Sequence, residues 1–266
     1  MKLLYTKDIC NNDILTDENQ EHQVMMEWEK PYMEKCIEIL DPSGSVLEIG
    51  FGLSYSANAI CTNSNVKEYN VIECSPDVWI KFEEFKKEIN NIRPELEINL
   101  IKGRWQDVLS CSKKYDYIFF DDYLSLDADE NNQRFNKFLY QALKDHTNIG
   151  SKISLYSTKK LLYDISCIIC SNEEIKIDIP KHCNYAKGTT MYIPLIEKIA
   201  DCNDDLKDKL LPKKIKYANT NYNQAVTIKK PEFKQSIYCN YLVIDNFYNN
   251  AMETRNYILT QNFSVK

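Results

Sequence analysis

Short apolar runs alternate along the chain with segments whose apolar residues recur at helical spacing. Five runs predict β-strands: SVLEIG (45–50), EYNVIEC (68–74), LEINLIKG (96–103), YDYIFFDD (115–122) and KISLYS (152–157). The uninterrupted YIFF in the fourth run is typical of a strand that is buried on both faces of a sheet. The segments with helical spacing predict helices at residues 28–40, 55–61, 75–89, 132–146 and 159–169.

The order of these elements predicts the fold class. Two further runs, residues 173–179 and 189–199, predict a closing pair of strands. Strands that alternate with helices form βαβ units, so the pattern predicts an α/β fold with a doubly wound, mostly parallel sheet and an antiparallel closing strand. The first 24 residues are polar, and we expect them to be mobile until they pack.

The same pattern predicts where a ligand binds. Doubly wound sheets bind ligands at the carboxyl ends of their strands, where the strand order reverses. Gly50–Gly52, Glu73 and Asp121–Tyr123 each lie at the end of a predicted strand. We therefore expect these residues to meet in one site.

Composition and charge exclude several classes of protein. The chain has 266 residues, of which 44% are hydrophobic and 12% aromatic, as suits one large α/β domain, or one domain plus a fragment. A net charge of −6 argues against nucleic-acid binding through counterion release. No apolar run approaches the ~20 residues of a membrane span, and no signal peptide is recognisable, so we expect a cytoplasmic protein that binds no membrane.

The ten cysteines are scattered through the chain, which predicts reduced thiols and no disulfide framework. Cys167 and Cys170 form a C-x-x-C pair, and a zinc site would place such a pair in a polar, turn-rich segment. Here the pair lies in the apolar run ISCIIC, which favours packing in the core and no metal ligation.

The run VLEIGFG (46–52) reads as a strand that enters a Gly-x-Gly turn before a helix. Glycines let the backbone approach a ligand closely, and a helix N-terminus offers free amides. A dinucleotide fingerprint needs a third glycine, but Tyr55 follows the turn. Glu73, at the end of the next strand, is placed to bind ribose hydroxyls. This combination favours S-adenosylmethionine (SAM) over a pyrophosphate cofactor, and the alternative is any other Rossmann-like turn.

An ordered series of motifs resembles one family. They are VMMEWEKPYM (24–33), VLEIGFG (46–52), KGRWQDV (102–108), YDYIFFDDY (115–123), RFNKF (134–138) and HCNYAKGTTMYIPLIEK (182–198). Together they resemble the guanidinoacetate N-methyltransferase family and, more distantly, protein arginine δ-N-methyltransferase. The resemblance covers roughly residues 20–198, and EWEKPYM is its most distinctive piece. It implies a Rossmann-like class I methyltransferase that uses SAM to methylate a small guanidino compound, first of all guanidinoacetate, giving creatine.

The resemblance also implies the site residues. Glu29 and Asp121 match the two carboxylates that hold the guanidinium and act in catalysis. The implied substrate-binding residues are Glu29, Met33, Asp121, Tyr123, Thr158 and Lys159. The implied cofactor-binding residues are Met25, Gly50, Phe51, Gly52, Leu53, Ser54, Tyr55, Ser56, Glu73, Cys74, Ser75, Arg104, Trp105 and Asp121. Tyr5 is a candidate for the N-terminal aromatic residue that covers the cofactor in the family.

The chemistry explains why two acids are needed. A guanidinium is planar and protonated in water, so its accepting nitrogen must be held in line with the methyl group and must lose a proton. Two carboxylates can fix the plane through bidentate N–H bonds, and one of them can take the proton. Without the partner motifs, Glu29 would read as a solvated helix acid and Asp121 as a strand-end cap.

Two departures from the family pattern leave the substrate open. Asp122 adds a third acid, which favours a more cationic substrate, so arginine, free or in a protein, is an alternative. Thr158-Lys159 stands where the family holds the substrate carboxylate with Thr-Ser. A further alternative is a non-catalytic cofactor-binding domain of a bifunctional fusion, against which the intact Glu29 and Asp121 argue.

The domain organisation follows from the end of the resemblance. Residues 1–198 are expected to form the methyltransferase domain, 199–235 a polar linker and 236–266 a C-terminal strand–helix extension. The extension resembles the opening of iron- and 2-oxoglutarate-dependent oxygenases, but no His follows His182 to build their metal triad. We expect it to be a truncated part of a fused oxygenase domain, and the alternative is an appended strand and helix packed on the main domain.

Overall fold

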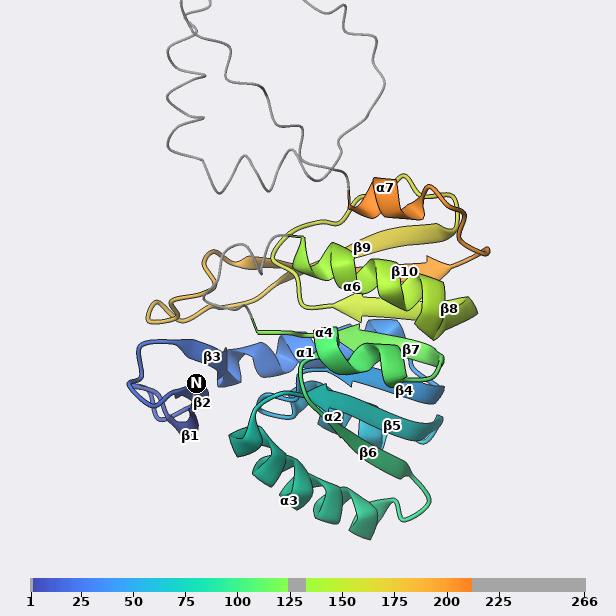
Figure 1. Ribbon diagram of the computed structural model, residues 1–266. Coiled ribbons are helices and arrows are strands. Elements are labelled where there is room, and N and C mark those ends of the chain that lie inside the picture. The colour runs from blue at the N-terminus through green and yellow to red at the C-terminus, as the bar shows by residue number, and fades with distance from the viewer. Residues whose placement is uncertain (1, 124–132, 212–266) are drawn as a thin grey trace, which may run out of the picture.

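A sheet of seven strands, in the order β6-β5-β4-β7-β8-β10-β9, is the centre of the domain (Figure 1). The structure is a computed structural model that describes residues 2–123 and 133–211. The strands are β4 Gly44–Ile49, β5 Val66–Glu73, β6 Glu97–Lys102, β7 Tyr115–Phe120, β8 Thr147–Leu155, β9 Ile168–Lys176 and β10 Thr190–Lys198. The strands from β6 to β8 are parallel, and β10 is antiparallel to both β8 and β9. The predicted mostly parallel sheet with an antiparallel closing strand is confirmed.

Helices cover both faces of this sheet. They are α1 Lys30–Leu40, α2 Tyr55–Thr62, α3 Pro76–Ile92, α4 Trp105–Val108, α6 Arg134–Gln141 and α7 Leu206–Leu210. Short turns extend three of them: 3-10 turns at Glu27–Glu29 and Leu109–Cys111, and a π-helical turn at Ala142–His146. α1, α2 and α3 pack in one core, and α4, α6 and α7 pack in the other. The fold is therefore doubly wound, as the alternation of elements predicts.

The strands divide their side chains between the two cores. In β4, Val46 packs toward α1–α3 and Leu47 packs toward α4, α6 and α7. In β5, Val71 and Ile72 divide in the same way. Successive side chains of a strand point to opposite faces, so a strand between two helical layers needs apolar residues at nearly every position.

The N-terminal residues form a second, small sheet, which corrects the expectation of a mobile segment. It consists of β1 Leu3–Lys7, β2 Asp13–Asp17 and β3 Gln23–Met26, antiparallel in that order. Leu15 and Met26 are each 1% exposed, and the Leu3 N–H donates to Asp77 Oδ2 of α3 at 2.8 Å. The strands are short and the turns between them are polar, so their few buried residues are hard to find in the sequence.

Residues 159–169 are not helical, so the helix predicted there is wrong. β9 begins at Ile168, earlier than the strand predicted at 173–179. Leu161 and Ile165 are buried in the core beneath α6, which explains the helix-like spacing. The backbone of Leu161 is bound by the side chain of Asn172, with Leu161 N to Oδ1 and Nδ2 to Leu161 O both at 2.8 Å. This amide takes the place of helical hydrogen bonds.

The packed part of the chain continues past residue 198. α7 lies within the segment predicted as a linker, and its Leu206 and Leu210 are 2% and 0% exposed. The rest of that segment and the predicted extension at 236–266, with its resemblance to oxygenases, lie outside the described residues. Among the described helices, none combines the length and apolar character needed to cross a bilayer.

Candidate active site

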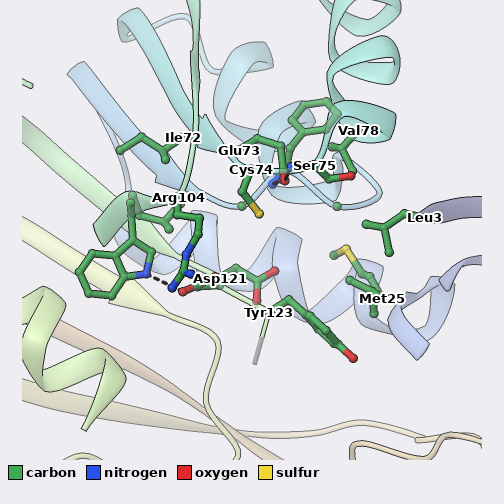
Figure 2. A pocket seen from close by; sticks show the side chains of 18 of the residues that line it. Leu3, Met25, Ile72, Glu73, Cys74, Ser75, Val78, Arg104, Asp121 and Tyr123 are labelled. Carbon is green, nitrogen blue, oxygen red and sulfur yellow. Dashed lines mark hydrogen bonds between the residues drawn. The ribbon is translucent and has the colours of Figure 1, made fainter. Parts of the chain in front are cut away.

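A cavity of about 540 Å³ opens at the carboxyl ends of β4, β5, β6 and β7 (Figure 2). The small sheet closes one side of it with Leu3, Leu15, Val24 and Met25. Figure 2 shows Leu3 and Met25 on one side and Arg104 on the other, with Asp121 between them. The strand order reverses between β4 and β7, so the cavity lies at the predicted position.

The glycine turn after β4 forms one wall of the cavity. Gly50 has φ +84°, and a Cβ atom there would lie 2.1 Å from the Asp121 carbonyl oxygen. Gly52 has φ +49°, and a Cβ atom there would lie 2.5 Å from Met25 Sδ. Both glycines therefore lie in the left-handed region, where side chains are unfavourable, and have no room for one. The Tyr5 hydroxyl donates to the Gly52 carbonyl at 3.0 Å, so the small sheet is tied to the turn.

Glu73, the last residue of β5, is held between this turn and the start of α3. Its Oε2 accepts the Phe51 N–H at 3.1 Å and its Oε1 accepts the Ser75 N–H at 2.7 Å. Burial raises the pKa of Glu73, while these amides act in the opposite direction. An ionised carboxylate has about four lone-pair sites. The backbone and the thiol of Cys74 also interact with this carboxylate, so several groups fix it at the edge of the cavity.

Asp122 forms an ion pair with Arg134 on the α4 side. Its Oδ2 accepts the Arg134 Nε–H and the Trp105 Nε1–H, each at 2.5 Å. The Arg134 and Asp122 side chains are only 10% and 14% exposed. A cation from α6 therefore pairs with the third acid that the sequence predicts, while the negative charge of Asp122 still acts on Asp121.

Asp121 follows β7 directly, and its side chain lines the cavity. The Asp121 N–H donates to Ile49 O at 2.9 Å, which fixes the backbone beside the glycine turn. No described residue forms a hydrogen bond with its carboxylate. Burial raises the pKa of Asp121 to about 7, and the negative charges of Asp122 and Glu73 add to the effect.

Glu29 is the last residue of the turn that precedes α1, and it is 3% exposed. Its Oε1 accepts the Met26 N–H at 2.9 Å and the Tyr185 hydroxyl proton. Within the described parts of the chain, its Oε2 has no hydrogen-bond donor. Burial and then the charge of Asp121 raise the pKa of Glu29 to about 8, against the effect of its two hydrogen bonds. The two acids are thus close enough to repel each other.

A sequence model of the guanidinoacetate N-methyltransferase family matches residues 13–158, more than half of the chain. The chain belongs to this family. Its fold is accordingly the Rossmann-like class I methyltransferase fold. No curated protein sequence matches the chain.

Several solved structures are similar to this family member. A putative O-methyltransferase from Klebsiella pneumoniae is 12% identical, covers 66% of this chain and 82% of its own, and has a TM-score of 0.43. TrmN from Thermus thermophilus is 10% identical, covers 66% and 50%, and has a TM-score of 0.45. An O-methyltransferase from Bacillus cereus in complex with SAH is 15% identical, covers 65% and 82%, and has a TM-score of 0.42.

Most of the residues implied by the family resemblance meet in the cavity. Those that line it are Met25, Gly50, Phe51, Gly52, Glu73, Cys74, Ser75, Arg104, Trp105, Asp121 and Tyr123. Those that do not are Glu29, Met33, Leu53, Ser54, Tyr55, Ser56, Thr158 and Lys159. Ser56 donates to Glu48 inside the core, and Thr158 is exposed. The Lys159 backbone is bound at both ends by Ser157 Oγ, with its N–H donating at 3.2 Å and its carbonyl accepting at 2.6 Å.

Sequence reasoning missed three contributors. Arg134 and Tyr185 lie within motifs of the resemblance, RFNKF and HCNYAKG, but nothing in those motifs shows that each binds an acid. The third group is the apolar side of the small sheet, Leu3, Leu15 and Val24. A strand of four or five residues with polar neighbours gives too weak a pattern to reveal it.

Two clusters of potential metal ligands lie in the turns of the small sheet and near the loop before β10. Asp8, Cys10 and His182 form one, and Asp17, Glu21 and His22 form the other. In the first, His182 Nε2 is already paired with Asp8 Oδ2 at 2.8 Å. In the second, Asp17 Oδ1 accepts two backbone N–H groups. Hydrogen bonds within the protein explain both clusters.

Proposed function

We propose that this chain is a SAM-dependent N-methyltransferase that methylates the guanidino group of a small molecule, with guanidinoacetate as the first candidate and creatine as its product. One observation carries the proposal. Glu29 and Asp121, 92 positions apart in the sequence, are enclosed and have raised pKa values, and the charge of Asp121 adds to the rise for Glu29. Two acids in such a place are unfavourable without a cation and favourable with one.

The residues around the cavity fit the donor. Gly50 and Gly52 line the cavity with bare backbone, so the turn can approach the methionine part of SAM closely. In this proposal Glu73 accepts a hydrogen bond from the ribose, and Arg104 and Trp105, which also line the cavity, flank the adenine. Ser75 Oγ and Gln106 Oε1 both belong to cavity-lining residues and are buried without a partner in the described parts of the chain. Buried polar atoms of this kind need a partner, which a polar ligand supplies.

Bound SAM would supply an electrophilic methyl group on a sulfonium. The protein's part is to hold one guanidinium nitrogen in line with that group and to remove its proton. Glu29 Oε2 and the Asp121 carboxylate accept N–H bonds that fix the plane of the cation. Positioning of this kind can contribute about 7–11 kcal/mol to lowering a barrier.

Asp121 is the proton acceptor in this scheme. Its carboxylate makes no hydrogen bond with the described residues, whereas Glu29 Oε1 already accepts two. The pKa of Asp121, raised to about 7, is nearer to neutrality than that of an ordinary aspartate. A general base works best when its pKa lies near the working pH.

The test is a panel of methyl acceptors. The purified chain is incubated with isotopically labelled SAM and guanidinoacetate, arginine, agmatine or an arginine-containing peptide, and the products are identified by mass spectrometry. We expect labelled creatine from guanidinoacetate. Turnover of arginine alone would support the arginine alternative. Binding of SAM with no methylation of any acceptor would support the non-catalytic alternative and contradict the proposal.

A further inference from the structure

Tyr156 lies beside Asp121 on the neighbouring strand. It follows Leu155, the last residue of β8, and its N–H donates to Phe120 O at 3.1 Å. β7 and β8 are parallel with Phe120 opposite Leu155, so Asp121 and Tyr156 are the next pair. Side chains of paired residues in parallel strands point to the same face. Phe119 and Tyr156 both pack in the core beneath α1–α3, which places Asp121 on that face as well.

The other side of the Tyr156 ring meets α1, the helix that follows Glu29. The Tyr32 ring packs edge-on against it, with the centroids 5.5 Å apart. Tyr32 is itself fixed, because its hydroxyl donates to Tyr192 O at 2.6 Å and accepts the Ser157 N–H at 2.9 Å. Glu29 precedes Tyr32 by three residues, which on a helix is the same face one turn earlier. Tyr156 therefore lies between the segment that carries Glu29 and the strand that carries Asp121.

The Tyr156 hydroxyl is a buried polar group without a hydrogen-bond partner in the described residues. Such a group is costly unless something binds it. The negative charges of Glu29 and Asp121, after burial, raise its pKa far above the ordinary range. The hydroxyl is thus neutral and near both acids, where a bound cation would lie.

We propose that Tyr156 is a positioning residue that binds the guanidinium together with Glu29 and Asp121, an inference that rests on the function proposed above. Its hydroxyl oxygen accepts one N–H of the substrate, and its own proton is donated to one of the two carboxylates. A guanidinium has five N–H donors in a fixed plane. Because Glu29 Oε1 already accepts two hydrogen bonds, the acids alone offer Glu29 Oε2 and the two Asp121 oxygens. A third contact group stops the flat cation from rotating and selects which nitrogen faces the methyl donor.

The test compares Tyr156→Phe with Tyr117→Phe. Tyr117 is also on the sheet, but its hydroxyl meets Ser43 at the opposite end of β7, at 3.4 Å. We expect Tyr156→Phe to raise KM for the guanidino substrate about tenfold or more, as for a lost hydrogen bond to a charged group, and to lower kcat. We expect its SAM affinity and melting temperature to match those of Tyr117→Phe. The pH at which kcat/KM rises should also increase, because the acid loses a donor that favours its charged form.

The outcomes separate the two proposals. If the wild-type chain methylates a guanidino compound and Tyr156→Phe has unchanged KM, kcat and pH profile, this inference is overturned and the proposed function stands. Loss of SAM affinity in Tyr156→Phe would show that the hydroxyl binds the methyl donor, and this result would also overturn the inference. Should the wild-type chain methylate no guanidino compound, the proposed function fails and the inference falls with it.

A second, independent observation concerns Cys167 and Cys202, whose sulfur atoms lie 2.7 Å apart. Cys167 precedes β9, and Cys202 follows the end of β10. The Ile199 N–H donates to Cys167 O at 2.9 Å, which holds the two segments together. Two thiols in van der Waals contact would be farther apart, so only a small movement separates the two sulfur atoms from a disulfide bond.

We propose that this pair is a site of reversible oxidation by a low-molecular-weight disulfide such as oxidised glutathione. The more exposed Cys202 attacks as a thiolate and releases one glutathione thiol. Cys167 then displaces the second, so two protein thiols are oxidised while one disulfide is reduced to two thiols. Burial and the contact with Cys167 raise the pKa of Cys202 to about 12, so the exchange should accelerate as pH rises. The bond would fix the segment that leads to α7 against the base of β9.

The test is incubation of the native chain with oxidised glutathione at pH 8.5, followed by peptide mass spectrometry without reduction. We expect a Cys167–Cys202 cross-link, lighter than the two free peptides by two hydrogens, and a melting temperature raised by roughly 5 °C or more until a reductant is added. Cys170→Ser should retain the cross-link and Cys202→Ser should lose it. Stable glutathione adducts on Cys167 or Cys202 in place of the cross-link, or a cross-link of either residue to another cysteine, would overturn this proposal.

Discussion

Gly50 and Asp121 approach each other so closely that a Cβ atom on Gly50 would lie 2.1 Å from the Asp121 carbonyl oxygen. The contact is set by strand pairing, because Gly50 N–H donates to Ile72 O of β5 and Asp121 N–H donates to Ile49 O of β4, both at 2.9 Å. The glycine turn is proposed to bind the methyl donor, and Asp121 is proposed to bind the methyl acceptor, so the two binding sites share this contact. A substitution at Gly50 would therefore displace Asp121.

Substituting the two glycines of the turn should give different results. In Gly50→Ala the methyl group meets rigid backbone, so Asp121 must move, and a misplacement of about 1 Å can lower a rate about 10²-fold. In Gly52→Ala the added methyl group meets Met25 Sδ, which lies on a flexible side chain. We expect that variant to lose mainly stability, on the order of 1 kcal/mol, because alanine is unfavourable at positive φ. Steady-state kinetics and urea unfolding measure the two effects, and equal losses of kcat/KM would contradict the argument.

Asp121→Asn keeps the shape of the side chain and removes its charge and basicity. We expect kcat to fall about 10²–10⁴-fold, the range for loss of a general base, with SAM affinity retained. Single-turnover kinetics and calorimetric titration with SAM separate the two quantities. Asp116→Asn, at the opposite end of the same strand, is the control and should leave both unchanged. A catalytically normal Asp121→Asn would assign the proton to another group.

The sequence predicts the elements whose pattern reflects only their own burial. YIFF in β7 is apolar because both faces of the sheet are covered, and the positions of Gly50, Glu73 and Asp121 follow from where their strands end. Residues 159–169 gave a wrong prediction because Leu161 and Ile165 have helical spacing, while the side chain of Asn172, from β9, binds the backbone there.

The pairings across the site could not be predicted from the sequence. Arg134 reaches Asp122 from α6, and Tyr185 reaches Glu29 from the loop before β10. Tyr156 ends a predicted strand and Tyr185 lies in a mostly polar segment, and nothing in their sequence neighbours assigns a role to either hydroxyl. Their hydroxyl groups acquire a role only from the tertiary placement of the two acids.

Glu29→Gln should alter the pH dependence of methyl transfer. With the pKa of Glu29 at about 8 and that of Asp121 at about 7, kcat/KM should rise with pH and level off above about 8, where both acids are ionised in the free enzyme. The two acids are coupled, so the profile reports apparent values for the pair. In Glu29→Gln we expect kcat/KM to fall at least about 30-fold, as when one partner of a buried charge pair is removed, and the rise to occur at lower pH.

The matched control for Glu29→Gln is Glu34→Gln, on the exposed side of α1. It should keep both the activity and the pH profile of the wild-type chain. If kcat/KM of the wild-type chain stays constant between pH 6 and 9, substrate binding does not require these acids to be ionised, and the argument is contradicted.

The stability of the ligand-free domain should fall as pH rises through the neutral range. Burial raises the pKa of Glu29 and Glu48 from 4.5 to about 8, and that of Asp121 from 3.8 to about 7. Between about pH 4 and pH 8 the folded chain therefore holds protons that the unfolded chain has released. The free energy of unfolding decreases with pH wherever the folded state binds more protons, here by on the order of 1 kcal/mol or more for each group. Urea unfolding at pH 5.5, 7.0 and 8.5 measures the slope of the free energy of unfolding against pH.

Glu29→Gln should reduce this slope, and Glu34→Gln should leave it unchanged. Binding of SAM with a guanidino substrate should also reduce the slope, because a bound cation favours the ionised acids. A stability that increases from pH 5.5 to 8.5 would show that the enclosed acids are already ionised in the ligand-free protein.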